Sequence, residues 1–191
     1  MKKVSFTEMK NETKEDYLFL DKHEKDFASK TADRILKFMA GLTETLEGYQ
    51  VSRLEHSLQS ASRAYRNGES DEMVVAALLH DIGDTIASAN HADLAATMLE
   101  PFVSEENYWI VKHHGIFQGY YFFEYLGLDK NMRDEYKDSP YWHACAEFCA
   151  KYDQNSFDPE YDNMALEDFE PMVRKVFARP RNSIYKKRDY A

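Results

Sequence analysis

Apolar residues recur at helical spacing along most of the chain, whereas the alternation typical of β-strands is hard to find. The first clear case begins at Thr31, where Ile35, Met39 and Leu42 fall on one face of an amphipathic helix. A second helix is predicted at residues 52–66, with Asn67-Gly68 as a left-handed cap at its end. The periodicity therefore predicts an all-α fold.

The helices that follow differ in how much of their surface is apolar. The run Met73–His80 is apolar on every side, which predicts a fully buried helix that carries His80 and Asp81 into the interior. Asn90 is a suitable N-cap for the next helix, so His91 is expected in its first turn. Further helices are expected at residues 108–114, 120–126 and 141–152.

The two ends of the chain differ from this helical middle. Residues 1–28 are polar and charged apart from the patch Tyr17–Leu20, and we interpret them as an arm with one short docking helix. Residues 29–178 form the expected domain, whose last helix has Pro171 in its first turn. Residues 179–191 are interpreted as a basic tail. A chain of 191 residues suits one domain with a buried core.

Composition and charge narrow the function classes. The formal net charge of -10 at pH 7 would repel a phosphate backbone, and the cationic cluster lies in the tail, so we expect no nucleic-acid partner. The first residues lack the apolar stretch of a signal peptide, and no run approaches a membrane span. Cys145 and Cys149 are expected to stay reduced in the core. We therefore predict a cytoplasmic protein without a membrane partner, and the sequence sets no oligomeric state.

A buried histidine followed directly by a buried aspartate is costly unless a cation or a partner compensates the carboxylate. His80 and Asp81 form such a pair. Other histidines at helix positions beside apolar residues are His56, His91 and His114. Each alone is more often a satisfied core residue, but four imidazoles with two carboxylates suit iron, manganese or zinc. One aspartate between two imidazole-rich halves could bridge a metal pair, so the residues predict a dinuclear site.

The order of these residues resembles that of the HD superfamily. His56, then His80-Asp81, then His91 and His114, then Asp153 follow the six-ligand pattern of the HD-domain mixed-valent diiron oxygenases. That family includes myo-inositol oxygenase and the phosphonate-cleaving HD oxygenases. The resemblance covers about residues 45–160 and includes the segments Leu54–Gln59, His80–Gly83 and Lys151–Asp153. It implies an HD-domain helical bundle around a dinuclear metal site.

The resemblance also assigns roles to single residues. It implies that His56, His80 and Asp153 hold one iron, that His91 and His114 hold the other, and that Asp81 bridges them. His113 stays an alternative to His114, because neighbouring side chains on a helix diverge by about 100° and only one can face the site. The implied cofactor is a mixed-valent Fe(II)/Fe(III) pair. The implied reaction uses O2 to cleave the carbon–phosphorus bond of a 1-hydroxyphosphonate, giving a carboxylic acid and phosphate.

Two departures from the family pattern bear on the substrate. Asp84 stands three residues after Asp81, and Gln118 four residues after His114, where relatives carry cationic side chains. Their replacement suits a substrate with its own cationic end. Aromatic faces for a quaternary ammonium could come from Tyr120, Tyr121, Phe122, Phe123, Tyr125, Tyr141 and Trp142, although most of these rings are alternatively core residues. Within the family that the chain resembles, this pattern points toward the branch that converts 1-hydroxy-2-(trimethylamino)ethylphosphonate into glycine betaine and phosphate.

Other residues complete the hypothesis. Besides Asp81, Asp84 and Gln118, the resemblance implies a catalytic role for Tyr49 as a cap on the open iron position, because the phosphonate oxygenases carry a tyrosine upstream of their first histidine, although at a different spacing. An ordinary buried tyrosine is the alternative. Possible donors to the phosphonate group are Gln59, Arg63, Lys151 and Arg174. Two other function classes stay open. One is an HD-domain phosphohydrolase that attacks a nucleotide or small phosphate ester with metal-bound hydroxide, and the other is a sensor or binding module without activity.

Overall fold

The computed structural model describes residues 3–43 and 47–183. Within that part of the chain there are eight α-helices and no β-strand, which confirms the expected all-α fold. The α-helices are α1 (Lys14–Ser29), α2 (Thr31–Ala40), α3 (Arg53–Arg66), α4 (Asp71–Leu79), α5 (His91–Leu99), α6 (Glu105–Gln118), α7 (Trp142–Phe148) and α8 (Leu166–Phe177). The shorter segments are the 3-10 helices η1 (Met9–Asn11), η2 (Gly119–Tyr121), η3 (Phe123–Leu126) and η4 (Met132–Tyr136), and the π-helical turn η5 (Cys149–Asp153). None of the helices described is both long and apolar enough to cross a membrane.

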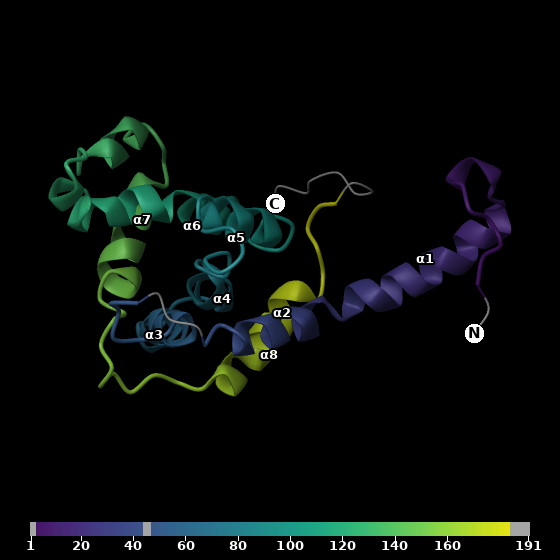
Figure 1. The fold of residues 1–191 in the computed structure, drawn as a ribbon, viewed down its shortest axis with the longest axis horizontal. Helices are drawn as coiled ribbons and strands as arrows, with labels where there is room; N and C mark the ends of the chain where they lie inside the picture. The colour runs from purple at the N-terminus through teal and green to yellow at the C-terminus, as the bar shows by residue number, and fades with distance from the viewer. Residues whose placement is uncertain (1–2, 44–46, 184–191) are drawn as a thin grey trace.

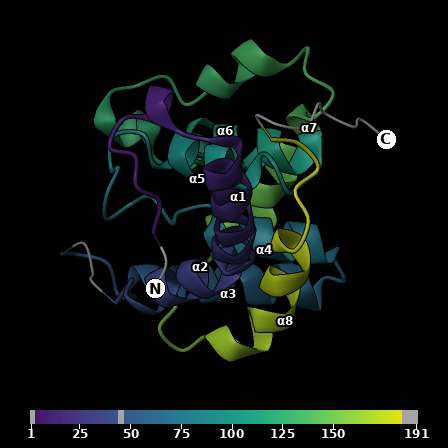
Figure 2. The same ribbon diagram turned by 90° about the vertical axis from the view of Figure 1, so that its right-hand side faces the viewer.

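Helix α4 lies at the centre of the body and packs against α3, α6 and α8. Residues Val74–Leu79 are all buried, as the unbroken apolar run predicts. In the end-on view α5 and α6 lie on one side of the body, with α2, α3 and α8 on the other (Figure 2). Because Val74–Leu79 are buried on every face, His80 and Asp81 at the end of α4 lie in the interior between these two layers.

Helix α3 begins and ends where the sequence predicts. The Oγ of Ser52 accepts from the backbone N–H of Glu55 (3.1 Å), and the Glu55 carboxylate accepts from that of Ser52 (2.6 Å), which forms a capping box. At the other end Gly68 has φ +81°, the left-handed conformation expected of the cap. These caps fix the register of α3 and the face on which His56 lies.

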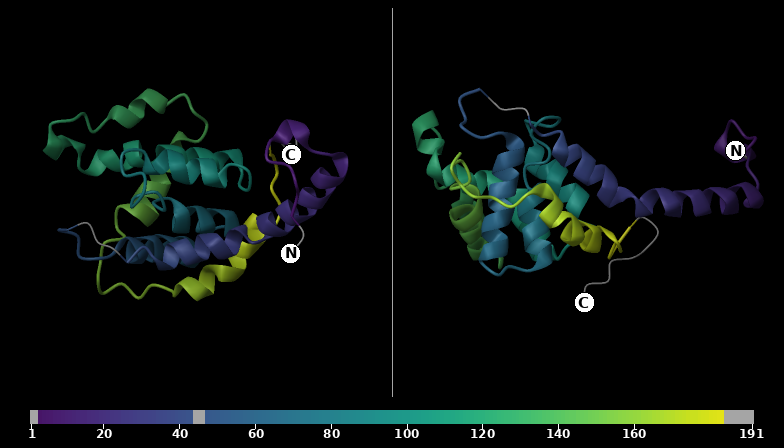
Figure 3. Two further views of the ribbon diagram at one scale, coloured as in Figure 1. Left: turned by 45° about the vertical axis from the view of Figure 1, so that its right-hand side comes forward. Right: turned by 90° about the horizontal axis from the view of Figure 1, so that it is seen from below.

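The N-terminal arm differs from the expected short docking helix. Helix α1 has 16 residues, none of them buried, and it projects away from the other helices (Figures 1 and 3). Local interactions support it instead of packing: Thr13 and Asp16 form a capping box, and Lys25 pairs with Asp21 one turn earlier (2.6 Å). The patch Tyr17–Leu20 is therefore not buried against the helical body.

Three later elements are reshaped relative to the sequence expectation. Residues 120–126 form two 3-10 turns, η2 and η3, and not one helix, although Gly127 ends them in the left-handed conformation (φ +75°). The helix expected over 141–152 stops at Phe148 and continues as the π turn η5. Helix α8 begins at Leu166, so Pro171 lies in its second turn; the Asp168 carboxylate caps the start by accepting from the N–H of Ala165 (2.9 Å).

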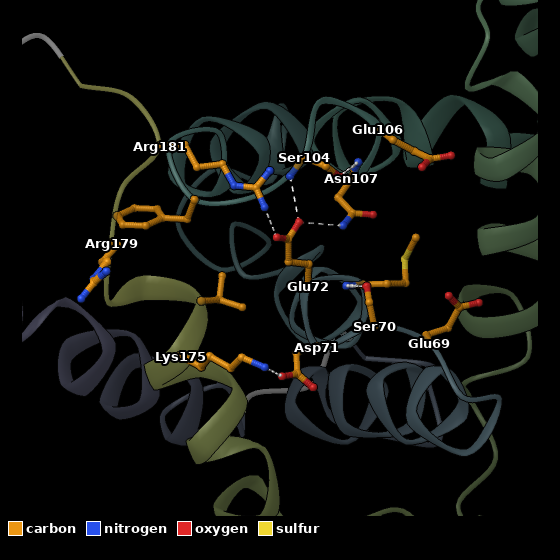
Figure 4. Close-up of a pocket in the computed structure, with 13 residues that line it drawn as sticks. Glu69, Ser70, Asp71, Glu72, Ser104, Glu106, Asn107, Lys175, Arg179 and Arg181 are labelled. Carbon is orange, nitrogen blue, oxygen red and sulfur yellow. Dashed lines mark hydrogen bonds and ion pairs between the residues drawn. The ribbon is translucent and has the colours of Figure 1, made fainter. Parts of the chain in front are cut away.

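The chain beyond α8 folds back against the start of α4 and α6 (Figure 4). Glu72 accepts from the backbone N–H of Ser104 (2.9 Å) and from the Arg181 guanidinium, and Lys175 pairs with Asp71 (2.6 Å). These groups line a pocket of about 750 Å³. Most of its polar groups are paired with one another, so we interpret the pocket as the place where the chain after α8 docks. The remainder of the expected basic tail, residues 184–191, lies outside the described residues.

Candidate metal centre

Six side chains from five segments converge in the interior. They are His56 of α3, His80 and Asp81 at the end of α4, His91 at the start of α5, His114 of α6, and Asp153 at the end of η5. Five of the six residues are buried, and the His91 side chain is 28% exposed. Their ligand atoms form three overlapping groups in which all atoms lie within 4.8 Å of one another.

The Asp81 carboxylate lies at the middle of the cluster, with each oxygen facing a different pair of imidazoles. Its Oδ2 is 3.3 Å from Nε2 of His56 and 3.5 Å from Nε2 of His80. Its Oδ1 is 3.0 Å from Nε2 of His114 and 3.4 Å from Nε2 of His91. On the Oδ2 side, Asp153 Oδ1 lies 3.4 Å from His56 Nε2 and 3.7 Å from His80 Nε2. This is the arrangement of one carboxylate shared between two neighbouring sites.

Backbone carbonyls fix the tautomer of three of the imidazoles. The Nδ1 atoms of His56, His80 and His114 lie 2.9, 2.8 and 2.6 Å from the carbonyl oxygens of Ser156, Ala77 and Val111, respectively. A carbonyl only accepts, so each Nδ1 carries a hydrogen and a neutral ring directs its Nε2 lone pair into the cluster. The Nε2 atoms of His56 and His80 are 3.1 Å apart. Two such lone pairs cannot face each other without a proton or a cation between them.

The spacing of the ligand atoms suits a metal ion. Divalent transition metals bind nitrogen and oxygen ligands at about 2.0–2.2 Å, so adjacent ligand atoms on one ion lie roughly 3.0–3.5 Å apart. The contacts within the cluster fall mostly in that range. In addition, Oδ2 of Asp153 is buried without a hydrogen-bond partner among the described residues, an arrangement that a bound cation would relieve. The residues present therefore fit a dinuclear metal site.

The electrostatics of the cluster favour positive charge. Burial lowers the pKa of His56, but hydrogen bonds to Asp153 and Asp81 outweigh it and raise the pKa to about 10. Burial is likewise outweighed in His114, where Asp81 raises the pKa to about 9. Burial would raise the pKa of Asp81, yet the surrounding imidazoles hold it well below its usual range. Protons or metal ions are thus drawn to the same positions.

His113 does not enter the cluster. Its Nδ1 lies 2.8 Å from the carbonyl oxygen of Trp109, and its ring stacks on the Trp109 indole with centroids 4.0 Å apart. Burial lowers the pKa of His113, the opposite of the shift in His114. Of the two neighbours on α6, the structure therefore places His114 at the site, as the family pattern implies.

A cavity of about 560 Å³ opens onto the cluster. Apart from the clustered histidines and aspartates it is lined by Tyr49, Arg53, Asp84, Thr85, Ser88, Gly115, Gln118, Phe122 and Phe157. Tyr49 is 49% exposed, and its ring stacks on Phe157, which in turn stacks on His56. The amide of Gln118 donates to Asp153 Oδ1 (3.1 Å). Tyr49 and Gln118 therefore do lie at the cavity, and Tyr49 is not the buried tyrosine of the alternative.

Asp84 lies at the cavity wall, but its charge is already engaged. Its Oδ2 is 3.0 Å from the Arg53 guanidinium, and its Oδ1 is 3.2 Å from Nδ1 of His91. Burial and the nearby Asp81 raise the pKa of Asp84, while Arg53 and His91 oppose the shift. Arg53 is absent from the sequence-based candidates, although it precedes His56 by three residues and so shares its face of α3. The cavity thus has a cation where the sequence predicts only an anion.

Two expected phosphonate donors on α3 are structural instead. The Gln59 amide donates to the carbonyl of Asp158 (2.7 Å) and accepts from its N–H (3.3 Å). Arg63 donates to the carbonyl of Asn155 (2.8 Å). Both side chains hold the loop after η5 against α3, which keeps Asp153 and Phe157 in place. Sequence position alone could not separate this role from substrate binding.

The other expected substrate contacts also lie away from the cavity. Lys151 pairs with Glu147 on the same helical run (3.2 Å), and Arg174 pairs with Asp33 (2.7 Å). Tyr121 does not line the cavity, and the ring of its neighbour Tyr120 is covered by the Arg133 guanidinium at 3.7 Å. The same guanidinium lies 5.4 Å from the Trp142 ring. Within the expected aromatic cluster, only Phe122 lines the cavity.

Gly83 allows the backbone after Asp81 to approach the start of α5. A Cβ at this position would lie 2.8 Å from both Cα and the carbonyl oxygen of His91, closer than real Cβ contacts permit. We expect Gly83→Ala to lower the free energy of unfolding by about 1–3 kcal/mol, because backbone must move to relieve the overlap. Urea denaturation measures the loss. The matched control is Ala89→Ser, an exposed position on the same loop; equal stability of both variants would contradict the close approach.

Comparison with known proteins agrees with this geometry. The family model of the HD domain matches residues 53–140, which include five of the six clustered residues; Asp153 lies beyond the match. A curated relative, 1-hydroxy-2-(trimethylamino)ethylphosphonate dioxygenase (glycine-betaine-forming) of Leisingera caerulea, is 30% identical over 105 residues. The match covers 47% of this chain and 54% of the relative, so the chain spans about half of that protein's length. Residues 53–140 of the helical body therefore match an HD domain, and they contribute five of the six clustered histidines and aspartates that suit metal ions.

Proposed function

We propose that the chain is an HD-domain diiron oxygenase that cleaves the carbon–phosphorus bond of a 1-hydroxyphosphonate. The observation that carries the proposal is the Asp81 carboxylate, whose two oxygens face separate imidazole pairs at 3.0–3.5 Å. In this proposal His56, His80 and Asp153 hold one iron, and His91 and His114 hold the other. When bound, the pair supplies O2 activation and a Lewis acid for the substrate oxygens. The similarity to a dioxygenase over half its length supports this choice of chemistry.

Arg53 is the residue that we assign to the anionic group of the substrate. Its guanidinium lines the cavity and lies 4.0 Å from Asp81 Oδ2, on the side of His56 and His80. A phosphonate with one oxygen at that site would place another within reach of Arg53. Guanidinium groups bind such oxygens through charge-assisted hydrogen bonds. The walls formed by Phe122 and Phe157 would keep water from the reacting carbon.

The first substrate to test is 1-hydroxy-2-(trimethylamino)ethylphosphonate, with glycine betaine and phosphate as products. It is the compound in the relative's name. Three aromatic side chains line the cavity, but Phe157 already stacks on Tyr49 and His56, and the Arg53 guanidinium lies 5.1 Å from the Tyr49 ring. We therefore assign the quaternary ammonium to the third ring, Phe122. Asp84 would contribute little to the cation, because Arg53 and His91 already bind its two oxygens.

The proposal is tested by loading the anaerobically purified protein with Fe(II) and measuring O2 uptake and phosphate release. The panel contains the trimethylamino compound, its primary amine analogue and an uncharged 1-hydroxyphosphonate. Phosphate release in step with O2 uptake, fastest with the trimethylamino compound, is the expected result. If phosphate were released from all three compounds without preference for the trimethylamino compound, the oxygenase activity would be supported but the proposed substrate would be rejected. No O2 uptake with any phosphonate would overturn the proposal.

A metal-dependent phosphohydrolase is the second candidate, and one observation favours it. Arg53 gives the cavity a cation beside the cluster, and a phosphate ester would use it as readily as a phosphonate. In that case metal-bound hydroxide would attack phosphorus. Hydrolysis of nucleotides or small phosphate esters with Mn²⁺, in the absence of O2 uptake, would establish this function instead.

Removal of the Arg53 charge should weaken substrate binding. We expect Arg53→Gln to raise KM for the phosphonate by roughly 10–100-fold, since a hydrogen bond to a charged group contributes about 1.5–3 kcal/mol. The matched control is Arg66→Gln, which removes the same charge from the exposed last turn of α3. Steady-state phosphate release gives KM and kcat for each variant. An unchanged KM in Arg53→Gln would contradict the assignment.

A further inference from the structure

Asp84 distinguishes His91 from the other three clustered histidines. The Nδ1 atoms of His56, His80 and His114 are held by backbone carbonyls, whereas Nδ1 of His91 faces a carboxylate oxygen of Asp84 at 3.2 Å. The opposite ring nitrogen of His91 lies 3.4 Å from Asp81 Oδ1. The His91 imidazole is thus held between two carboxylates, one on the cluster side and one behind it.

The backbone and a cation hold Asp84 in this position. Its N–H donates to the Asp81 carbonyl (3.0 Å), and its own carbonyl accepts from the Ser88 hydroxyl (2.7 Å). Arg53 binds its second carboxylate oxygen (3.0 Å). The close approach of Gly83 to the His91 backbone brings Asp84 next to His91. Asp84 is therefore fixed from three directions before any ligand enters the cavity.

His91 needs such support more than the other histidines. It is the first residue of α5, and its side chain is the most exposed of the six. His91 has no helical turn before it, whereas Nδ1 of His114 bonds the Val111 carbonyl in the preceding turn of α6. A carboxylate behind an imidazole accepts the Nδ1 hydrogen, orients the ring and increases the basicity of Nε2. Without it, either ring nitrogen could carry the hydrogen.

We propose that Asp84 is a positioning residue that holds His91 in the orientation needed to bind the second metal ion, and is not the anchor for a cationic substrate. The inference rests on the metal pair of the proposed function. It deepens that proposal by giving the two metal positions unequal support. The position of His56, His80 and Asp153 is formed by buried groups, whereas that of His91 and His114 depends on a side-chain contact at the cavity wall.

Asp84→Asn tests the inference because an amide cannot satisfy both partners. If its oxygen faces His91, its NH2 group meets the Arg53 guanidinium. If its oxygen faces Arg53, its NH2 group forces Nδ1 of His91 to accept, and the hydrogen moves to Nε2. We expect the second Fe(II) to bind about 10–100-fold more weakly, as on loss of other such contacts, while the first binds normally. Anaerobic equilibrium dialysis against buffered free Fe(II) measures both affinities without any turnover.

Two further variants keep the test decisive. Asp93→Asn is the matched control, since it removes an exposed carboxylate from the first turn of the same helix, and it should bind two ions as wild type does. Asp84→Glu retains the charge and should recover part of the affinity even if Asp84→Asn folds poorly by circular dichroism. The coupled Fe(II)/Fe(III) paramagnetic signal should weaken in parallel with loss of the second ion.

The possible outcomes separate this inference from the proposed function. The inference would be overturned if folded Asp84→Asn bound both ions with wild-type affinity, or if Asp84→Glu and Asp84→Asn both did so. The oxygenase proposal would still stand. Two ions in wild type with selective loss in Asp84→Asn, but no phosphonate oxidation, would support the inference and overturn the oxygenase. A wild-type chain that binds fewer than two ions would overturn both.

Discussion

Asp81→Asn is expected to yield a protein that holds at most one ion and is slower by about 10³-fold or more in any metal-dependent reaction. The two carboxylate oxygens of Asp81 face different imidazole pairs. An asparagine keeps an oxygen on one side and places an NH2 group on the other, where it repels a cation. Loss of one ion removes several kcal/mol of charge stabilisation, and each 1.36 kcal/mol is a factor of ten in rate.

Iron content after desalting and initial rates of O2 uptake measure the two effects of Asp81→Asn. Asp93→Asn again serves as the control for loss of one carboxylate near the site. A second control, His113→Gln, removes an imidazole adjacent to His114 that points toward Trp109 and should retain both ions. If Asp81→Asn retained two ions and more than about a tenth of the rate, a bridging role for Asp81 would be excluded.

The fold was predictable because its central helix is specified by local sequence. The apolar run before His80 leaves no polar face, so burial on all sides follows from hydrophobicity alone. The capping residues Ser52 and Glu55 and the left-handed Gly68 set the limits of α3 in the same local way. These interactions involve neighbours within four residues, so sequence spacing captures them.

The ends of the chain were harder to predict because propensity and packing compete there. The polar composition of the arm suggests little helix, yet capping and charge pairs one turn apart support 16 helical residues without burial. In α8, Pro171 favours a helix start, but the Asp168 cap begins the helix five residues earlier. Boundaries of this kind depend on small energy differences between neighbouring registers.

The metal cluster was accessible from sequence, whereas the cavity in front of it was not. His56, His80 and His114 lie beside apolar residues on helices, and their burial follows from that pattern. The pairing of Arg53 with Asp84 depends instead on how the start of α3 packs against the loop after α4. Similarly, the Tyr120 ring is covered by Arg133, thirteen residues further along. Which charged groups face the cavity, and which of them pair with one another, therefore depends on tertiary packing even for residues close to a motif in sequence.

Asp153 shows how a local irregularity can set a ligand position. The regular periodicity of residues 141–152 continues into the π turn Cys149–Asp153, in which the N–H of Gln154 bonds the carbonyl of Cys149 (3.0 Å). A π turn takes up one extra residue and shifts every side chain after it by about 100° relative to a regular helix. Helical periodicity locates the segment but cannot foresee this rotation, which directs Asp153 toward His56.

Metal removal should reverse the pH dependence of stability. In the metal-free protein the pKa values of His56 and His114 are raised to about 10 and about 9, above the value of about 6.5 expected in the unfolded chain. Groups whose pKa is raised by folding stabilise the fold fully below about pH 6.5, and that stabilisation is lost as pH rises through the folded values. The lowered pKa of Asp81 acts only below about pH 4 and leaves this window unaffected.

We therefore expect the free energy of unfolding of the metal-free protein to fall by roughly a few kcal/mol between pH 6.5 and 9.5, since each pKa unit corresponds to about 1.4 kcal/mol. With metal present the trend should disappear or invert, because the ions replace the protons on His56 and His114 and bind more tightly as competing protons are removed. Urea denaturation in chelator and in buffered Fe(II), at several pH values, measures both curves. His56→Gln should flatten the metal-free curve, since its raised pKa is the larger of the two. A metal-free curve that rises toward pH 9.5 would show that the imidazoles are not the groups that balance the buried carboxylates.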